Sequence, residues 1–403
     1  MNAIAKGAAL LVTLLLQLLC VAKHKSETAK EQSVMQQIKP SMKQLYLQKF
    51  EQWSGPTSEG QSNEEILDAR DIKSRIADYS TRENVYYTNL EARYPRFSSK
   101  EIFLGSYLGN GAYGVVYEIT GFTCLKSPQN CQAVPNQEGR MMVKNSCQVL
   151  DDRPQFALKK VRGKLSKRDH MDAVMDIAIE AQRLSQISHP NIVKMCGTSD
   201  KDPLSANFFV IMERLCATLE DRLFDWREQV TCTNKSRFCF GFGKTKRRVL
   251  NDLWIKRLSV AKELASAISY LHEYNIIYRD IKPDNIGFSM EGKLKLFDFG
   301  LAKPLQAADR LEESGLYQLT GTAGSRRYMA PEVALCEPYG LRADMYSFAM
   351  LLWQICALET PFKDLSGVDE HFEEVVLGGR RPKIHRKWPK SWGLFMQKCW
   401  HGK

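Results

Sequence analysis

The stretch YRDIKPDN, Tyr278–Asn285, decides the fold together with the triplet Asp298-Phe299-Gly300 that follows it. A run with helix-like apolar spacing, Trp254 to Leu271, precedes the stretch, and an apolar strand-like run over 294–297 ends directly before Asp298. Both motifs are therefore expected at the ends of buried helices and strands.

A glycine-rich stretch, LGNGAYGVVYEI from Leu108, lies much earlier in the chain. Alternating apolar residues on both sides predict two strands joined by a glycine turn, in which bare backbone N–H groups can approach phosphate oxygens closely. A dinucleotide-binding turn shares the Gly-x-Gly-x-x-Gly spacing, but its last glycine opens a helix, whereas Val115-Val116 continue a strand here. An ordinary glycine-rich hairpin is the alternative that this stretch alone leaves open.

A lysine and a glutamate follow the glycine turn. Phe156 to Lys159 is strand-like, and Glu180 lies in a predicted helix with apolar residues at three- and four-residue steps between Val174 and Ile187. A Lys159–Glu180 ion pair can hold an ammonium group against the α- and β-phosphates of a nucleotide. On its own, such a pair could equally be a surface salt bridge of little energetic value.

These motifs, followed by Ala330-Pro331-Glu332, occur together and in an order that resembles the eukaryotic protein kinases from about Ile102 to Trp400. The resemblance implies an α+β, bilobal protein kinase fold, with a small, mostly β N-lobe, a larger helical C-lobe and ATP between them. Segments 344–348, 351–353 and 399–400 look like the tyrosine-kinase-like group of Ser/Thr kinases.

The resemblance also implies catalytic roles. Asp280 would accept or orient the proton of a substrate hydroxyl, and Lys282 would neutralise charge on the transferred γ-phosphoryl group. Asn285 and Asp298 would hold Mg²⁺, which prefers oxygen ligands. Lys282-Pro283 is typical of Ser/Thr kinases, while dual specificity stays open.

A nucleotide pocket is implied in the same way. Val116 and Ala157 would sandwich the adenine, Met212 would limit the back of the pocket, and segment 212–215 would link the lobes. The full set of residues expected to bind ATP is Leu108, Gly109, Gly111, Gly114, Val116, Ala157, Lys159, Met212, Glu213 and Leu215.

Other residues are expected to support this machinery. Tyr278 stands at a position where most family members have histidine. It would stack with Phe299, Leu184 and Met195, and Asp344 would anchor this stack. Ordinary core packing predicts the same burial for these residues. Segment 298–332 would be a regulatory loop. Thr320 or Thr322 is the predicted phosphorylation site, with Arg279 available to pair with the phosphate, and Ser325 would contact Asp280 and Lys282.

Three regions are expected along the chain: an apolar leader over 1–22, a polar N-terminal region with short helices over 23–100, and a kinase domain over 101–403. The apolar run 7–22 could be a secretory signal peptide or a membrane anchor, and a misassigned start would leave a cytoplasmic protein. Amphipathic stretches within 34–50 and 66–76 are expected to pack on a neighbouring domain.

Two insertions interrupt the kinase pattern. Residues 120–154 are interpreted as a surface excursion. Residues 227–250 include a basic run, 227–248, which could contact an acidic protein partner or acidic lipid, although a solvated loop is the plainer reading; no specific nucleic acid is predicted. The net charge of +11 also favours anionic partners.

Composition and chain ends complete the prediction. With 44% hydrophobic and 26% charged residues, the 403-residue chain is neither wholly disordered nor a multi-span membrane protein, and its eleven scattered cysteines suggest no disulfide framework or zinc site. Family members usually continue beyond Trp400 to an arginine that pairs with Glu332, so a truncated C-lobe is expected. Besides an active Ser/Thr kinase, two other functions stay open: a scaffold without catalytic activity, and a simple nucleotide-binding ATPase.

Overall fold

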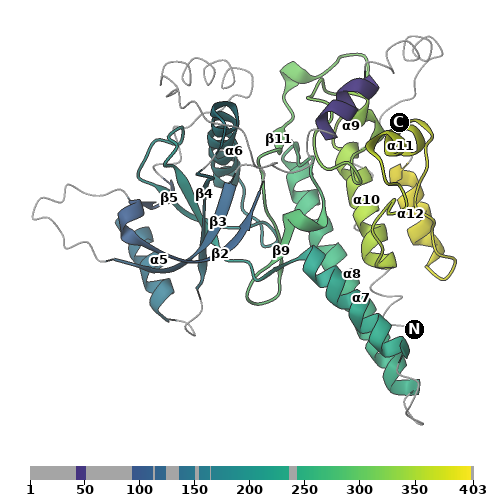
Figure 1. Cartoon of the computed structure of the whole chain (residues 1–403), viewed down its shortest axis with the longest axis horizontal. Coiled ribbons are helices and arrows are strands. Elements are labelled where there is room, and N and C mark those ends of the chain that lie inside the picture. Colours follow the sequence, from purple (N-terminus) through teal and green to yellow (C-terminus); the bar gives the residue numbers. More distant parts are fainter. Residues whose placement is uncertain are drawn as a thin grey trace, which may run out of the picture. The chain divides into compact units, whose positions relative to one another are not determined.

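The computed structural model describes residues 42–50, 93–111, 114–123, 136–149, 154–163, 165–235 and 243–400. They belong to two compact units (Figure 1): a sheet unit within Gly60–Cys216 and Phe288–Gly300, and a helical unit within Met1–Glu59, Ala217–Gly287 and Leu301–Lys403. The apolar run 7–22 and the stretch 66–76 lie outside the described residues. Of the helices that are described, none is both long and apolar enough to cross a membrane.

The sheet unit contains a six-stranded sheet in the order β1-β5-β6-β4-β3-β2. Neighbouring strands are antiparallel except for the parallel pair β1 and β5. The elements of this unit are β1 (Arg96–Phe97), η2 (Ser99–Glu101), β2 (Ile102–Asn110), β3 (Gly114–Phe122), α5 (Gln137–Val149), β4 (Phe156–Val161), α6 (Lys167–Gln186), β5 (Met195–Ser199), β6 (Phe209–Glu213) and β10 (Leu294–Leu296).

The two faces of this sheet have different roles, because side chains alternate along each strand. Phe156 and Leu158 of β4 belong to a buried apolar cluster with Ile119 and Ile211. Ala157 and Lys159 fall in the alternate positions, on the opposite face. The predicted strand that ends in Lys159 is therefore central in the sheet, with one face in the core.

Helix α5 lies within the first predicted insertion, 120–154. It packs against β3 and contributes Val143 to the apolar cluster. Its Arg140 and Lys144 form ion pairs with the buried Glu101, at 2.6 and 3.1 Å. The interpretation of 120–154 as a surface excursion is therefore wrong for this helix, which closes one face of the sheet.

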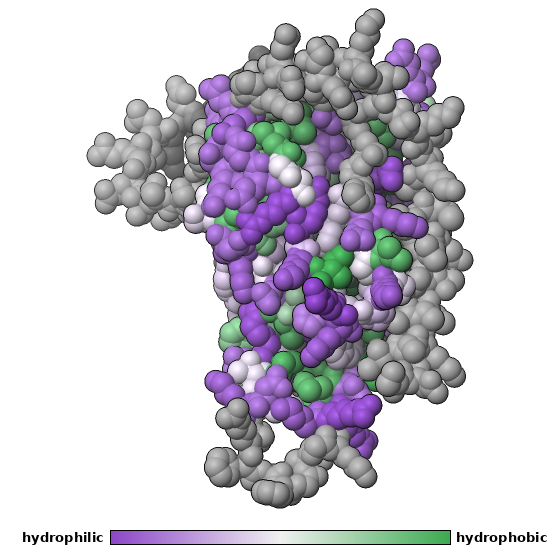
Figure 2. All heavy atoms as spheres, turned by 90° about the vertical axis from the view of Figure 1, so that its right-hand side faces the viewer, coloured by the Kyte–Doolittle hydropathy of each residue, from purple (hydrophilic) through white to green (hydrophobic). Residues whose placement is uncertain are grey.

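The helical unit is built around α10, nearly all of whose side chains are buried. Helix α10 packs against α8 and α12. The elements are β7 (Ala217–Thr218), α7 (Leu219–Lys235), α8 (Gly243–Glu273), β8 (Ile276–Ile277), η3 (Pro283–Asn285), β9 (Ile286–Phe288, at the boundary of the unit), β11 (Lys303–Pro304), η4 (Ala307–Asp309), α9 (Pro331–Ala334), α10 (Arg342–Ala357), α11 (Val368–His371), the π-helical turn η5 (Phe372–Leu377) and α12 (Lys390–Trp400), besides a helix over residues 42–50. On the face shown in Figure 2, hydrophobic side chains form small patches among hydrophilic ones.

Much of the second insertion is also helical. Residues 227–235 belong to α7 and residues 243–250 to α8, so the interpretation of 227–250 as a solvated loop is wrong for these parts. Residues 236–242 lie outside the described part of the chain. An acidic protein or lipid partner for the basic residues stays a prediction.

The predicted fold class is confirmed at the level of its parts, a β-sheet unit and a mainly helical one. Glu332 takes part in an interaction in the structure. Six of the cysteines are free thiols: Cys196, Cys216, Cys232, Cys336, Cys356 and Cys399.

Candidate active site

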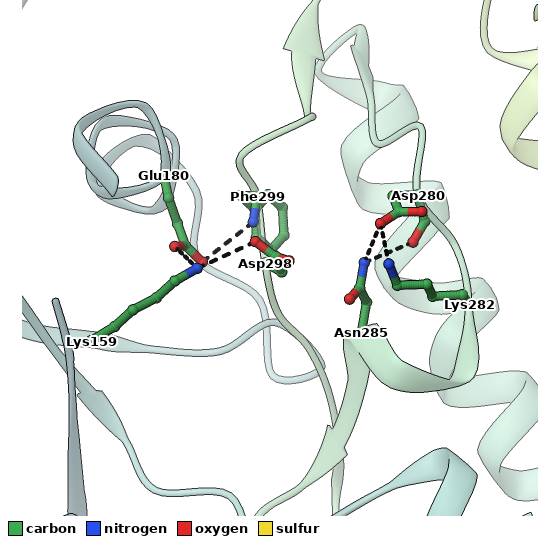
Figure 3. Close-up of polar contacts among 7 residues, drawn as sticks. All are labelled: Lys159, Glu180, Asp280, Lys282, Asn285, Asp298 and Phe299. Carbon is green, nitrogen blue, oxygen red and sulfur yellow. Dashed lines mark hydrogen bonds and ion pairs between the residues drawn. The ribbon is translucent and has the colours of Figure 1, made fainter. Parts of the chain in front are cut away.

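In the sheet unit, the ammonium group of Lys159 lies among acidic side chains (Figure 3). Its Nζ is 2.5 Å from Glu180 Oε2 and 3.3 Å from Asp298 Oδ1. Strand β4 supplies the lysine, α6 the glutamate, and the segment after β10 the aspartate. The backbone N–H of Phe299 also donates to Glu180 Oε1, at 3.4 Å, and so ties the triplet 298–300 to α6.

The electrostatics of this group keep Lys159 charged. Burial alone would lower its pKa, but Asp298, Glu180 and Asp176 outweigh that effect and raise it. Burial raises the pKa of Asp176 to about 7, Lys159 opposes the shift, and the carboxylates of Asp298 and Glu180 add to it. Three acidic side chains around one ammonium group make a site suited to a ligand that brings further positive charge, such as a metal-bound phosphate.

The backbone at Asp298 is in the left-handed region, with φ of 65°. A non-glycine residue in this region costs about 1–3 kcal/mol unless its surroundings hold it there. Its carboxylate contacts Lys159, and the next N–H donates to Glu180, which supplies two of these restraints. Strain of this kind concentrates at functional sites.

The predicted nucleotide-binding residues lie on one face of the sheet. Across β3, β4 and β6, Val116 pairs with Lys159, and Ala157 pairs with Met212. Directly opposed residues on neighbouring strands share a face, so these four side chains are on the same side. Met212 and Ala157 are buried.

The remaining predicted nucleotide-binding residues lie at the edges of this face. Leu108, Gly109 and Gly114 belong to the β2–β3 hairpin, with Gly111 in its turn, and Glu213 ends β6 shortly before Leu215. The chain passes from the sheet unit to the helical unit directly after this segment, at Cys216–Ala217. Segment 212–215 therefore leads into the connection between the units, as predicted.

The fold itself makes no steric demand for glycine at two positions of the turn. A Cβ at Gly109 or Gly111 would meet no heavy atom within 4 Å. Neither residue has positive φ. A demand for glycine at these positions would therefore come from something that the turn binds, or from its motion, which favours the phosphate-binding interpretation over an ordinary hairpin.

In the helical unit, Asp280 is the centre of a hydrogen-bond network (Figure 3). Its Oδ2 accepts from Lys282 Nζ at 2.7 Å and from Asn285 Nδ2 at 2.8 Å. Its Oδ1 accepts from Ser325 Oγ at 2.8 Å. Both carboxylate oxygens are thus directed by three side chains, and the predicted contact of Ser325 with Asp280 is present.

A second aspartate holds the start of this loop. Asp344, fully buried on α10, accepts from the backbone N–H groups of Tyr278 and Arg279, each at 2.8 Å. His272 Nε2 lies 2.9 Å from the same carboxylate. This aspartate therefore anchors the residues that lead into Asp280.

Another close contact connects this loop to segment 322–328. A Cβ at Gly324 would lie 2.2 Å from the Arg279 carbonyl oxygen, and the φ of Gly324 is +97°. Only glycine fits there. The close approach holds the next residue, Ser325, beside Asp280.

The other supporting residues are placed as follows. Tyr278, Phe299, Leu184 and Met195 are all buried, an outcome that both stacking and ordinary core packing predict. Arg279 donates to the Leu301 carbonyl oxygen at 2.6 Å. Phosphorylation at Thr320 or Thr322 stays a prediction.

Sequence reasoning missed three residues. Asp176 lies one helical turn before Glu180, so its four-residue spacing was the available signal. His272 falls at the end of the predicted helix with no motif to mark it. Tyr46, buried against His371, lies within the amphipathic stretch 34–50, where no motif marks it.

Comparisons with known proteins agree with this arrangement. Residues 138–401 match the protein kinase domain family. The relatives include the dual specificity protein kinase shkA of Dictyostelium discoideum, 26% identical over 76% of this chain and 47% of that protein. They also include the serine/threonine-protein kinase STY17 of Arabidopsis thaliana, 28% identical over 61% of this chain and 38% of that protein.

A putative serine/threonine-protein kinase/receptor, R826 of Acanthamoeba polyphaga mimivirus, is 28% identical over 75% of this chain and 14% of that protein. The chain thus spans less than half the length of each of these relatives. The matched family model covers well over half of the chain, including Lys159, Glu180, Asp280 and Asp298. The chain belongs to the protein kinase family, as its motifs predicted, and its relatives are Ser/Thr and dual-specificity kinases.

Proposed function

We propose that this chain transfers the γ-phosphoryl group of ATP to serine and threonine hydroxyls of protein substrates. The observation that carries the proposal is the environment of Asp280, whose carboxylate is fixed by Lys282, Asn285 and Ser325. A hydroxyl brought to this carboxylate would find an acceptor for its proton and, at Lys282, a cation for the incoming phosphoryl group.

ATP would be held by the sheet unit. The Lys159 ammonium group, kept charged by its acidic neighbours, would bind the α- and β-phosphates, and the bare backbone at Gly109 and Gly111 would lie over them. Val116, Ala157 and Met212 would supply the apolar surface for adenine. These side chains share one face of the sheet, which supports a single nucleotide site.

Mg²⁺ would be bound by Asn285 and Asp298 together with the ATP phosphates. Among the described residues, no group of three or more His, Cys, Asp and Glu side chains could hold a metal ion. Magnesium usually takes one or two protein oxygens and completes its shell with phosphate and water, so an amide oxygen and a carboxylate are donors that suit this metal. Because Nδ2 of Asn285 donates to Asp280, its amide oxygen is the atom available as a ligand.

The choice of hydroxyl rests on the loop sequence. Lys282 follows Asp280 by two residues and contacts it at 2.7 Å, in the loop pattern that resembles Ser/Thr kinases. Since the relatives include kinases named as dual specificity, tyrosine is the competing acceptor.

The test is phosphotransfer by the purified full chain from Mg-ATP to three peptide pools that differ only in carrying serine, threonine or tyrosine. Activity on the serine and threonine pools should fall about 10²–10⁴-fold in Asp280→Asn, because general-base assistance is lost. Lys159→Met should raise the KM for ATP and lower kcat. Wild-type activity equal to that of both variants would refute the proposal and favour a scaffold role.

A further inference from the structure

The helix over residues 42–50 (the purple helix of Figure 1) lies on the helical unit through one buried side chain. Tyr46 is fully buried, and its ring centroid lies 4.9 Å from that of Phe372. Its hydroxyl is 2.9 Å from Nδ1 of His371. A tyrosine buried with its hydroxyl paired is the arrangement expected of a docked anchor rather than of a solvent-exposed helix.

The pairing with His371 does not depend on pH in the physiological range. Burial lowers the pKa of His371 to about 3, with Arg326, Arg327 and Arg381 adding to the effect. The imidazole is therefore neutral at pH 7 and can pair with the neutral tyrosine hydroxyl.

Lysine side chains extend the contact on both sides of Tyr46. Lys43 Nζ lies 2.6 Å from Asp369 Oδ1 and 2.6 Å from Glu373 Oε1, on α11 and η5. Lys49 donates to the backbone carbonyl of Thr322. Residues 43, 46 and 49 recur at three-residue steps and so share one face of the helix, while Leu45 is 50% exposed.

Lys49 brings the helix to the segment that contacts the proposed catalytic group. Thr322, which accepts from Lys49, precedes Ser325 by three residues, and Ser325 donates to Asp280. The helix thus contacts the segment that places Ser325 against Asp280.

A substrate has to use the same surface. Proton transfer to Asp280 requires the substrate hydroxyl within about 2.6–3.2 Å of its carboxylate. Because Ser325 donates to that carboxylate at 2.8 Å, a peptide that brings a hydroxyl to it approaches the segment that runs from Thr322, where Lys49 is bound, to Ser325.

We propose that residues 42–50 form an internal inhibitor, which competes with the protein substrate for the surface formed by Thr322, His371 and Phe372. The inference rests on the proposed phosphotransfer at Asp280. Release of the helix frees the surface for substrate and leaves the nucleotide-binding residues unchanged.

The kinetic test uses the full chain and varies peptide and ATP separately. Tyr46→Ala removes the anchor and should lower the KM for peptide about tenfold, with the KM for ATP changed less than twofold. Leu45→Ala, on the exposed side of the same helix, is the matched control and should behave like wild type. An unchanged or higher peptide KM in Tyr46→Ala would overturn the inference.

A charge exchange separates docking from general damage. Lys43→Glu should activate in the same way as Tyr46→Ala, and the triple variant Lys43→Glu with Asp369→Lys and Glu373→Lys should restore inhibition. All three side chains are partly exposed and outside the catalytic network, so folding should be preserved. Failure of the triple variant to restore inhibition would contradict the proposed contact.

Binding in trans distinguishes this inference from the proposed function. A fluorescent peptide of residues 41–51 should bind the Tyr46→Ala chain and inhibit competitively against peptide but not against ATP; the same peptide with Tyr46→Ala should do neither. A chain that phosphorylates substrates but does not bind this peptide would refute the inference alone. A chain that binds it but phosphorylates nothing would refute the proposed function and, with it, the inhibitory role.

Discussion

Replacement of Asp344 tests how the catalytic loop is held. Its buried carboxylate accepts from the backbone N–H groups of Tyr278 and Arg279 at 2.8 Å and pairs with His272 at 2.9 Å. In Asp344→Ala these three polar groups lose their partner. Each buried donor left unpaired costs about 1–3 kcal/mol, which gives a range of about 3–9 kcal/mol in the free energy of unfolding.

The lower part of that range is expected, because the substitution also removes a buried charge whose desolvation is costly. About 4 kcal/mol corresponds to a decrease in Tm of roughly 8–16 °C for a domain of this size. Asp344→Asn keeps one acceptor oxygen and should lose about half as much. Since the loop leads to Asp280, kcat should also fall at temperatures where the variant is fully folded.

The assay is thermal unfolding followed by circular dichroism, with kinetics measured about 20 °C below each variant's Tm. Asp284→Ala is the matched control, because Asp284 is an exposed carboxylate in the same loop and surface substitutions change stability by about 0.5 kcal/mol or less. A Tm for Asp344→Ala within 2 °C of wild type would refute the reasoning.

Three more predictions follow from single contacts. Gly324→Ala would place a Cβ 2.2 Å from the Arg279 carbonyl oxygen at a φ of +97°, so kcat should fall at least tenfold by peptide phosphorylation assay, and an unchanged kcat would contradict the close approach. Burial raises the pKa of Asp176 to about 7, from an unfolded value near 4. The carboxylates of Asp298 and Glu180 add to this shift, and the ammonium group of Lys159 opposes it. Its contribution to the free energy of unfolding is therefore full below about pH 4 and is lost as the pH rises through 7. Between pH 5.5 and 8.5, urea unfolding should show that wild type loses about 2 kcal/mol more unfolding free energy than Asp176→Asn. Equal losses in the two proteins would refute this assignment. Val143→Ala should cost about 1–2 kcal/mol of unfolding free energy, whereas Met142→Ala, 71% exposed on the same helix, should cost almost nothing, and equal costs would show that α5 is not part of the core.

The parts of the site that the sequence predicted are those held by local geometry. Asp280, Lys282 and Asn285 lie within one short loop, so their mutual contacts follow from spacing. The Lys159–Glu180 pair joins a strand to a helix, and both elements have clear apolar periodicity. Periodicity and short motifs were sufficient for these residues.

The parts that the sequence did not predict depend on tertiary packing. Helix 42–50 was expected to pack on a neighbouring domain, but which side chain is buried depends on the surface it meets, and Tyr46 rather than Leu45 is buried. The burial of His272 beside Asp344 likewise depends on how α8 packs against α10. Periodicity cannot reveal a partner that is distant in the chain.

Helix α5 shows why an insertion need not be peripheral to the function of a sheet. Glu101, buried at the end of η2, is neutralised by Arg140 and Lys144 of α5, the helix whose Val143 packs in the apolar cluster on the face opposite Lys159. Removing α5 would expose the apolar cluster and leave Glu101 without these two cations, which is costly for a buried carboxylate. Leu158 of that cluster and Lys159 are consecutive residues of β4. A displacement of Leu158 would therefore also displace the backbone of Lys159 and, with it, the ammonium group. The insertion is therefore part of what positions the proposed nucleotide site.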